Sequence, residues 1–266
     1  VQTTNTLRIA NTSPTAASAA ADLNGKATQL ACEAILSRLK DVAAELVECG
    51  SADEITIEDG VVMRGGESTD LDWPTLVSEA HLKRVNLSEH SHYATPGIHF
   101  DWSTAKGHPF AYHVFGTAIV GVTVDCLRGR YEFDFVKNVH DFGKSMNTSV
   151  DIGQVEGGIA QGIGWMTLEE VIYDDEGALR SNALSTYKIP DVYSVPVVLD
   201  TLPLKTDKKN LAIYSSKAVG EPPLMYGIGA YFAIRDAIRS FDGSLSPVFD
   251  APFTPEKVLM NLYGER

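Results

Sequence analysis

Glu221 is the acidic residue whose surroundings best suit a fixed base. It lies between a glycine and two prolines, in the run Gly220–Pro223. Prolines restrict the backbone, so the carboxylate is held in place. The nearby side chains are apolar, and an apolar pocket disfavours a charged carboxylate and makes it a better base; these residues are Ala218, Val219, Leu224 and Met225. The alternative is a first-turn acid that complements the dipole of the next helix.

Gln154 is a second side chain that could contact a ligand. It lies among glycines in Asp151–Gly158, at the start of an expected helix. An amide can donate and accept hydrogen bonds at a ligand without adding charge. A surface or capping glutamine beside closely packed backbone would give the same pattern, so both interpretations stay open.

Hydroxyl residues followed by very small ones form a third candidate, in Asn11–Asp22. The first-turn amides of a helix lack intrahelical partners and lie at the positive end of its dipole, where they can bind an anion. Small side chains would let a bulky ligand reach that backbone. An ordinary capped helix is the alternative, and the pattern alone favours it.

Three helices are expected to position these candidates. Apolar spacing predicts a long helix over residues 14–47 that ends near Gly50, a second over 152–171, and a third after Pro223. The second contains five glycines, each of which costs about 1 kcal/mol relative to alanine inside a helix. We therefore expect another backbone or a ligand to pack very close to it.

The remaining pattern predicts an α+β fold. A hairpin is expected at 55–63 with Asp59-Gly60 in the turn, followed by a short helix capped by Asp72. A longer hairpin is expected over 113–139, and a last helix capped by Thr254. Further strands are expected at 195–202 and 211–214. We expect one domain over 1–266, with sub-lobes at 1–105 and 106–266.

The overall charge narrows the function. The chain has 22 Lys and Arg against 35 Asp and Glu, a net charge of −13. This balance disfavours binding to nucleic acid or to anionic lipid, which requires basic residues. No apolar run approaches the roughly 20 residues that span a bilayer. Three scattered cysteines suit a reduced, cytoplasmic compartment and match neither a zinc site nor a disulfide framework.

The histidines do not indicate a metal site. His90, His92 and His99 lack supporting carboxylate or cysteine spacing, so no protein metal ligand is predicted. His108, His113 and His140 are interpreted as structural residues. No glycine-rich nucleotide motif occurs either, which disfavours a nicotinamide or nucleoside triphosphate site.

Taken together, the candidate segments resemble the C-terminal part of the molybdenum-binding region of xanthine dehydrogenases. The similarity covers nearly the whole chain and includes the spacing of 67 positions between Gln154 and Glu221. It is carried by the runs NTSPTAASAAAD, DIGQVEGGIAQGIGWMTLEEVIYDDEGAL, STYKIP and AIYSSKAVGEPPL. The piece SKAVGEPPL discriminates best, because related aldehyde oxidases usually carry a different tetrapeptide after the same Gly-Glu.

The resemblance implies a role for each candidate residue. Glu221 would be the general base, taking a proton from a hydroxide on molybdenum that attacks an electron-poor purine carbon. Gln154 would hydrogen-bond a ligand of the molybdenum centre, and Ala17 would lie against that centre. Ala16 would lie beside the substrate, and Thr15 and Ser18 would hold the pterin or its phosphate. The pterin holds the metal, so no protein ligand is required.

The resemblance also implies partners. Iron–sulfur clusters need cysteine-rich motifs that three scattered cysteines cannot supply, so these clusters and the flavin are expected in other domains or subunits. The preceding part of the molybdenum-binding region would supply the remaining contacts to the cofactor and to a purine substrate such as xanthine or hypoxanthine. The sequence, which begins at Val1, is expected to be part of a larger enzyme and inactive alone. Such a part should expose apolar surface that favours self-association, including a homo-oligomer.

Two alternatives remain. One is another molybdenum hydroxylase, acting on an aldehyde or on an N-heterocycle such as nicotinate. The other is a non-catalytic assembly module that keeps the fold without the cofactor. The presence of both Glu221 and Gln154 argues against the module.

Overall fold

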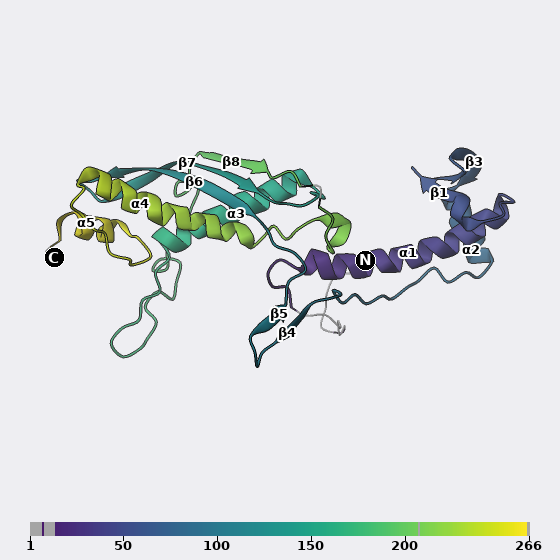
Figure 1. The fold of residues 1–266 in the computed structure, drawn as a ribbon, viewed down its shortest axis with the longest axis horizontal. Coiled ribbons are helices and arrows are strands. Elements are labelled where there is room, and N and C mark those ends of the chain that lie inside the picture. The colour runs from purple at the N-terminus through teal and green to yellow at the C-terminus, as the bar shows by residue number, and fades with distance from the viewer. Residues whose placement is uncertain (1–6, 8–13, 207, 265–266) are drawn as a thin grey trace. The chain divides into compact units, whose positions relative to one another are not determined.

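The computed structural model describes Leu7 and residues 14–206 and 208–264, which form two compact units (Figure 1). The smaller unit comprises Val1–Thr12 and Ala20–Gly97, and the larger comprises Ser13–Ala19 and Ile98–Arg266. The division at 97/98 lies eight residues before the expected lobe boundary at 105/106. It also assigns the short segment before the first helix to the larger unit.

The smaller unit packs two helices against a three-stranded sheet. Helix α1 (Ala20–Leu46) leads to the 3-10 turn η1 (Ala52–Glu54) and to strands β1 (Ile55–Glu58), β2 (Val61–Arg64) and β3 (Glu67–Asp72), followed by helix α2 (Trp73–Leu82). The antiparallel β1–β2 hairpin confirms the expected turn at Asp59-Gly60. Asp72 caps α2 by accepting the Thr75 amide at 2.9 Å, as predicted. The core contains Leu39, Val42, Ile55, Val62 and Leu76.

A three-stranded sheet forms the frame of the larger unit. After the small hairpin of β4 (His99–Asp101) and β5 (Lys106–His108), strands β6 (Gly116–Asp125) and β7 (Arg130–His140) pair antiparallel. This confirms the predicted long hairpin. Strand β8 (Val198–Pro203) then pairs parallel with β7, from Phe135–Val198 to His140–Pro203.

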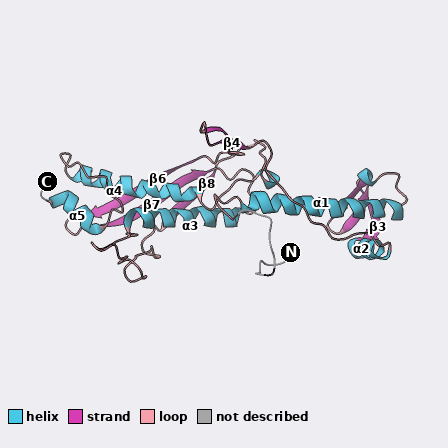
Figure 2. Ribbon diagram, turned by 90° about the horizontal axis from the view of Figure 1, so that it is seen from below, coloured by secondary structure: helices cyan, strands magenta, loops and turns pink. Residues whose placement is uncertain are grey.

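Helices α3 (Thr148–Thr167) and α4 (Ile228–Phe241) run side by side along this sheet (Figure 2). Between β8 and α4 come two 3-10 turns, η2 (Ile213–Ser215) and η3 (Pro222–Gly227), and helix α5 (Pro255–Tyr263) ends the described chain. Thr254 caps α5 as expected. Apolar side chains of α3, α4 and β7 fill the interior together with Phe253, which lies just before α5; those of the three elements include Val136, Val155, Ile159, Ile163 and Ile234.

The glycines of α3 allow the close approach that the sequence predicted. A Cβ on Gly162 would lie 2.2 Å from the Leu224 carbonyl oxygen, and one on Gly227 would lie 2.2 Å from the Gly162 carbonyl carbon. A Cβ on Gly158 would lie 2.9 Å from Pro223 Cβ. Helix α3 and η3 therefore touch through their backbones. By contrast, a Cβ on Gly153 or Gly157 would meet nothing within 4 Å.

Several predicted boundaries were wrong. Helix α1 begins at Ala20, because Ala17 and Ser18 have positive φ angles of 51° and 54° that interrupt a helix. It ends at Leu46, and Glu48 (φ 53°) is the left-handed residue that follows it. The Cys49 amide donates to the Ala44 carbonyl oxygen, so the expected cap at Gly50 was wrong. Helix α3 starts four residues early, because Asn147 caps it by accepting the Val150 amide.

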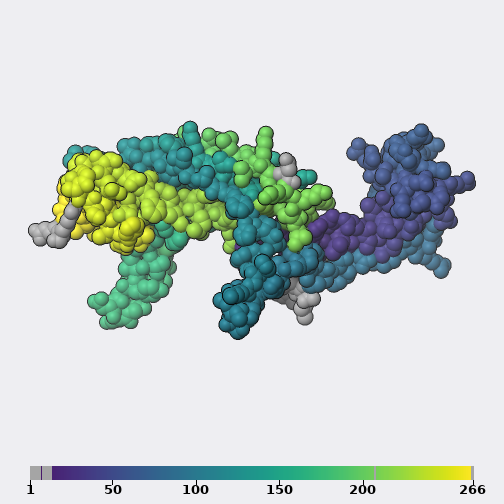
Figure 3. All heavy atoms as spheres, in the orientation of Figure 1, coloured from purple at the N-terminus to yellow at the C-terminus, as the bar shows by residue number. Residues whose placement is uncertain are grey.

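The predicted strand at 211–214 is also wrong. Ile213–Ser215 forms η2, and Tyr214 and Ser215 have positive φ angles of 50° and 62° that no strand accommodates. The strand expected at 195–202 is β8, shifted to 198–203. Part of the chain between α3 and β8 projects from the rest of the larger unit (Figure 3), and this chain also contains the exposed residues Val192 and Tyr193.

Two further features concern membrane-spanning helices and thiols. No helix in the described part of the chain combines the length and apolar character needed to cross a membrane. Cys32, Cys49 and Cys126 are free thiols.

The backbone contact between α3 and η3 gives a first prediction. We expect Gly162→Ala to lower the free energy of unfolding by about 1–3 kcal/mol, because the new methyl group would overlap the Leu224 carbonyl. Gly157→Ala is the matched control in the same helix, and it should be neutral or stabilising by up to about 1 kcal/mol. Denaturant unfolding of both variants checks this; equal effects would contradict the close packing.

Candidate active site

The three segments selected from the sequence meet around Glu221. Ser18 Oγ accepts a hydrogen bond from the Glu221 backbone amide at 2.9 Å and lies 3.4 Å from Glu221 Oε2, to which it can donate. The two residues are 203 positions apart in the sequence, and both belong to the larger unit. One serine hydroxyl therefore holds both the backbone and the carboxylate of Glu221.

Gly220 brings Gln154 into the same group. A Cβ on Gly220 would lie 2.8 Å from Ser18 Oγ and 3.2 Å from Gln154 Oε1. The first distance is shorter than real Cβ atoms show and the second is tight, so a larger residue here would push the Ser18 hydroxyl away and crowd the Gln154 amide. Gly153 and Gly157 are exposed on the same helix as Gln154. An open glycine surface thus lies beside the amide.

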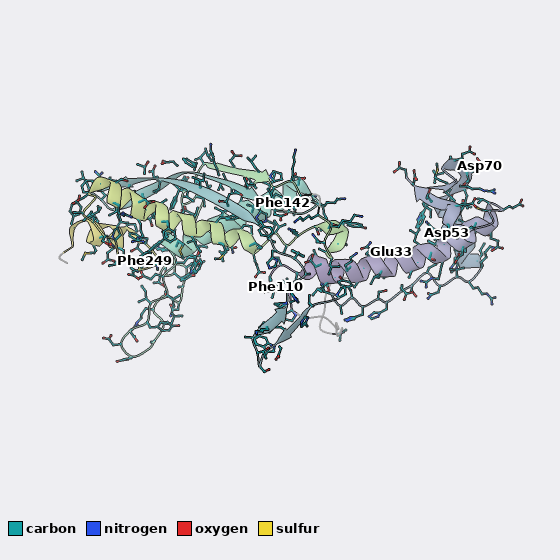
Figure 4. The ribbon with its side chains drawn as sticks, in the orientation of Figure 1. Glu33, Asp53, Asp70, Phe110, Phe142 and Phe249 are labelled. Atoms are coloured by element: carbon teal, nitrogen blue, oxygen red, sulfur yellow. The ribbon has the colours of Figure 1, made fainter. Side chains whose placement is uncertain are left out.

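The apolar pocket expected around Glu221 was wrong for the described residues, because its side chain is exposed. Val219 packs inward, against the cluster that includes Val136, Phe142 and Val155, and leaves the carboxylate outside. Figure 4 shows the buried Phe142 within the larger unit and Phe110, which is 69% exposed, near the β4–β5 hairpin. The chain therefore orients Glu221 without enclosing it.

The alternative interpretation of Glu221, a first-turn acid that complements the dipole of the next helix, stays open. Glu221 is the residue before η3, and its side chain makes no capping hydrogen bond there. The helix-start interpretation of residues 15–18 changes, because these residues precede α1 and Ala17–Ala19 form a turn. Thr15, Ala16 and Ala17 are exposed, and Ser18 is half-buried. Asn11–Ser13 of that motif lie outside the described residues.

Backbone strain marks the same turn. Ala17 and Ser18 both adopt the left-handed region, with φ angles of 51° and 54°. Non-glycine residues there cost on the order of 1–3 kcal/mol each, and such outliers gather at functional sites. The Ala19 amide bonds to the Ala16 carbonyl oxygen at 3.1 Å, which closes the turn and directs Ser18 Oγ to Glu221.

A buried ion pair holds the chain just before Glu221. The Lys217 ammonium pairs with Asp141, and their side chains are 10% and 2% exposed. Lys217 Nζ also donates to the His113 carbonyl oxygen at 2.8 Å and lies 5.4 Å from the centre of the Phe115 ring. Asp141 Oδ1 accepts the Gly143 amide at 3.0 Å. Both charges therefore have additional polar partners, which a buried pair requires.

A second buried contact holds the chain just after Glu221. His140 is fully buried, and its Nδ1 lies 2.7 Å from the Tyr226 hydroxyl. Burial lowers the pKa of His140, an effect that the negative charges of Asp141 and Asp151 partly oppose. Burial also raises the pKa of Tyr226. The pair therefore joins a neutral imidazole to a neutral phenol at neutral pH.

Sequence reasoning missed the roles of these four residues. Lys217 lies inside the most discriminating motif, yet we assigned it no function, and His140 was interpreted only as structural. The available signal was local: a single lysine precedes the apolar Ala218 and Val219, and His140-Asp141 ends a β-rich run. Their partners are 76 and 86 positions away, beyond what periodicity can reveal.

Two further observations concern other parts of the molecule. Among the described residues, no group of three or more His, Cys, Asp and Glu side chains is placed to hold a metal ion. A cavity of about 300 Å³ is lined by Tyr131, Thr167, Tyr193 and neighbouring residues. Thr167 and Gln154 are 13 residues apart on α3, or about 20 Å along its axis, so this cavity is separate from Glu221.

The comparisons with known proteins define the class. Residues 1–196 match the model of the molybdopterin cofactor-binding domain, and this chain belongs to that family. It is 40% identical to mouse xanthine dehydrogenase/oxidase over 262 residues, which cover 96% of this chain and 18% of the relative. The chain therefore spans about a fifth of the length of such relatives. This confirms the predicted resemblance.

Solved structures confirm the fold class. The crystal structure of quinoline 2-oxidoreductase from Pseudomonas putida 86 has a TM-score of 0.69 and 25% identity, covering 86% of this chain and 28% of that one. Aldehyde oxidoreductase from Desulfovibrio gigas has a TM-score of 0.57 and 28% identity, covering 70% of this chain and 19% of that one. The fold is thus that of a region within molybdenum oxidoreductases.

The burial of His140 gives a second prediction. An unfolded histidine takes up a proton near pH 6.5, whereas folded His140 resists protonation until lower pH. Its contribution to stability is therefore lost as the pH falls below about 6.5. In the wild-type chain the midpoint of thermal unfolding should fall as the pH is lowered from about 7.5 to about 5.5. We expect this fall to be smaller in His140→Gln. His92→Gln, at an exposed site, is the control; a wild-type slope in His140→Gln would contradict the assignment.

Proposed function

We propose that this chain supplies the general base and part of the cofactor cradle of a xanthine dehydrogenase-type molybdenum hydroxylase. One observation carries the proposal: Ser18, Gln154 and Gly220-Glu221, drawn from three distant segments, converge at one open surface. The matched family supports the cofactor, and the 40% identity to mouse xanthine dehydrogenase/oxidase supports the enzyme class. The substrate class is a purine such as xanthine or hypoxanthine.

The residues at the open surface suit a large anionic cofactor. The exposed backbone of Gly153 and Gly157 leaves room beside Gln154, because a Cβ at either glycine would contact nothing within 4 Å. The Gln154 amide adds no charge and can hydrogen-bond a ligand of the metal centre. Thr15–Ser18 present hydroxyls and backbone of small residues to the pterin or its phosphate. When bound, the molybdenum cofactor supplies two-electron oxidation of the substrate.

Glu221 has the geometry of a positioned base. Its carboxylate is exposed, so a reacting group can reach it, and Ser18 Oγ engages Oε2 at 3.4 Å. That leaves Oε1 to take up the proton released during hydroxylation. Because the Glu221 amide is bound by the same hydroxyl, the backbone and side chain keep a fixed relation to the Gln154 amide. General-base catalysis of this kind contributes about 10²–10⁴-fold.

The remaining partners follow from the length of the relatives. The chain covers 18% of the mouse relative, so iron–sulfur and flavin groups belong to other domains or subunits under this proposal. The preceding part of the molybdenum-binding region would complete the pocket and exclude water from Glu221. Exposed apolar residues such as Val192 and Tyr193 offer surface for such contacts or for self-association. Free cysteines suit a cytoplasmic setting.

A second candidate is a molybdenum hydroxylase with another substrate. The fold is shared with a quinoline 2-oxidoreductase and an aldehyde oxidoreductase, which act on the classes in their names. The motif SKAVGEPPL and the identity to xanthine dehydrogenases favour the purine. A kcat/KM higher for an aldehyde or nicotinate than for xanthine would reverse this preference. A non-catalytic assembly module would bind no molybdenum at all.

The general-base role gives a third prediction. In the full-length enzyme that contains this chain, Glu221→Gln should lower kcat for xanthine by about 10²–10⁴-fold, because the proton acceptor is removed while the side-chain shape is kept. Molybdenum content should stay unchanged. The exposed Glu176→Gln is the matched control and should keep full activity. Unchanged turnover in Glu221→Gln would exclude the assigned role.

A fourth prediction concerns the chain by itself. We expect the isolated 266-residue chain to show no xanthine turnover with an artificial electron acceptor, because it covers only 18% of its mouse relative. The full-length protein, assayed in parallel, is the positive control. Detectable turnover by the chain alone would refute the claim that its active site is incomplete.

A further inference from the structure

We propose that His140 and Asp141 form a two-point clamp that positions Glu221. The inference rests on the proposed function, because it gives these two residues a role through the general base. The clamp is made of two consecutive residues, the last residue of β7 and the one that follows it. Asp141 binds Lys217, four positions before Glu221, and His140 contacts Tyr226, five positions after it.

The first point of the clamp resists movement because it is buried and fully partnered. The Lys217 ammonium pairs with Asp141 and donates to the His113 carbonyl oxygen. The next amide, that of Ala218, donates to the Tyr112 hydroxyl at 2.9 Å. Moving Lys217 would leave the 2% exposed Asp141 as an unpaired charge, which is strongly unfavourable. The chain therefore enters the Glu221 segment from a fixed position.

The second point fixes the exit from the same segment. The Tyr226 hydroxyl lies 2.7 Å from His140 Nδ1 and packs against Gly116 at the start of β6. A Cβ on Gly116 would overlap that hydroxyl, so a larger residue there would displace Tyr226. His140 is fully buried, so protein encloses its side of the contact. Both ends of the Lys217–Tyr226 segment are thus attached to the rim of one sheet.

The exposed Glu221 needs such attachment. No apolar pocket of the described residues surrounds its carboxylate, and Ser18 is the side chain that bonds to it. Beyond this serine, orientation comes from the backbone, whose two attachment points lie nine positions apart. A displacement of about 1 Å at a reacting group can cost about 100-fold in rate. Lys217 and Tyr226, with their partners, therefore act as positioning residues.

The test combines a double-mutant cycle with hydrogen exchange in the full-length enzyme. Lys217→Met should lower kcat for xanthine by about 100-fold, with little change in KM or molybdenum content. In the Glu221→Gln background the same substitution should lower the residual kcat by less than about 3-fold, because the group it positions is gone. An equal loss in both backgrounds would overturn the proposal.

Hydrogen exchange gives a readout that does not depend on turnover. The amides of Ala218 and Glu221 donate to Tyr112 and Ser18, so a loosened clamp should expose them to faster exchange. We expect at least about 10-fold faster exchange in peptides covering these residues in Lys217→Met. Lys257→Met is the matched control, since Lys257 pairs with Glu170 and Asp250 elsewhere in the larger unit. Unchanged exchange in the clamp variants would overturn the inference.

Tyr226→Phe keeps the test decisive if Lys217→Met fails to fold. It removes one hydroxyl and should lower kcat by about 10-fold while leaving molybdenum content intact, with the faster exchange confined to the Glu221 segment. The two proposals fail in different ways. Full activity in Glu221→Gln would exclude the general-base role, and the clamp would then be tested by hydrogen exchange alone. Full activity and unchanged hydrogen exchange in Lys217→Met and Tyr226→Phe would exclude the clamp without contradicting the general-base role of Glu221.

Discussion

The arrangement around Glu221 depends on the buried ion pair between Lys217 and Asp141. Burying two charges is costly, and their attraction offsets the cost only when further hydrogen bonds complete the geometry. Here the Lys217 ammonium also donates a hydrogen bond to the His113 carbonyl oxygen, and the Asp141 carboxylate accepts one from the Gly143 amide. Removing one partner of such a pair costs about 3–5 kcal/mol. The path of the chain into Gly220 and Glu221 is therefore set by electrostatics.

A second constraint is steric and acts through glycine. Gly158 and Gly162 let α3 contact the backbone of η3, and Gly220 lets the side chains of Ser18 and Gln154 both approach its own backbone. These contacts fix the distance between the helix that carries Gln154 and the turn that follows Glu221. Larger residues would separate the two elements, and the amide and the carboxylate would no longer border the same surface. Glycine, which weakens a helix by itself, is what makes this pairing of elements close enough.

The sequence predicted those parts of the structure that depend on local chemistry. The hairpins, the caps Asp72 and Thr254, and the unusual glycines of α3 were all readable from neighbours along the chain. The strand expected at 211–214 failed because Tyr214 and Ser215 adopt left-handed backbone, which composition does not reveal. The ion pair of Lys217 was invisible for a different reason. Its partner is 76 residues away, and only the tertiary fold brings the two together.

The sequence selected the members of the candidate site, whose roles stay a prediction, and it was wrong about the surroundings of Glu221. Ser18, Gln154 and Glu221 were selected from three motifs, and the structure brings them together. Apolar neighbours suggested enclosure, but Val219 uses its apolar surface to fill the core. A side chain beside a functional residue can pack in either direction, and sequence alone does not say which. Glu221 is thus exposed because its apolar neighbour Val219 packs into the core and does not cover the carboxylate.

The exposure of Glu221 bears on two requirements of a catalytic base, a fixed orientation and the removal of water. A carboxylate in water is mobile and hydrated, and an efficient base has less mobility and less hydration. Within this chain, the Ser18 hydroxyl and the attachments at Lys217 and Tyr226 remove mobility. Hydration can be removed only by covering the open surface beside Gln154. Under the proposed function, the cofactor, the substrate and the rest of the enzyme provide that cover. On this proposal, orientation of the base is encoded in this chain, and its desolvation arises on assembly.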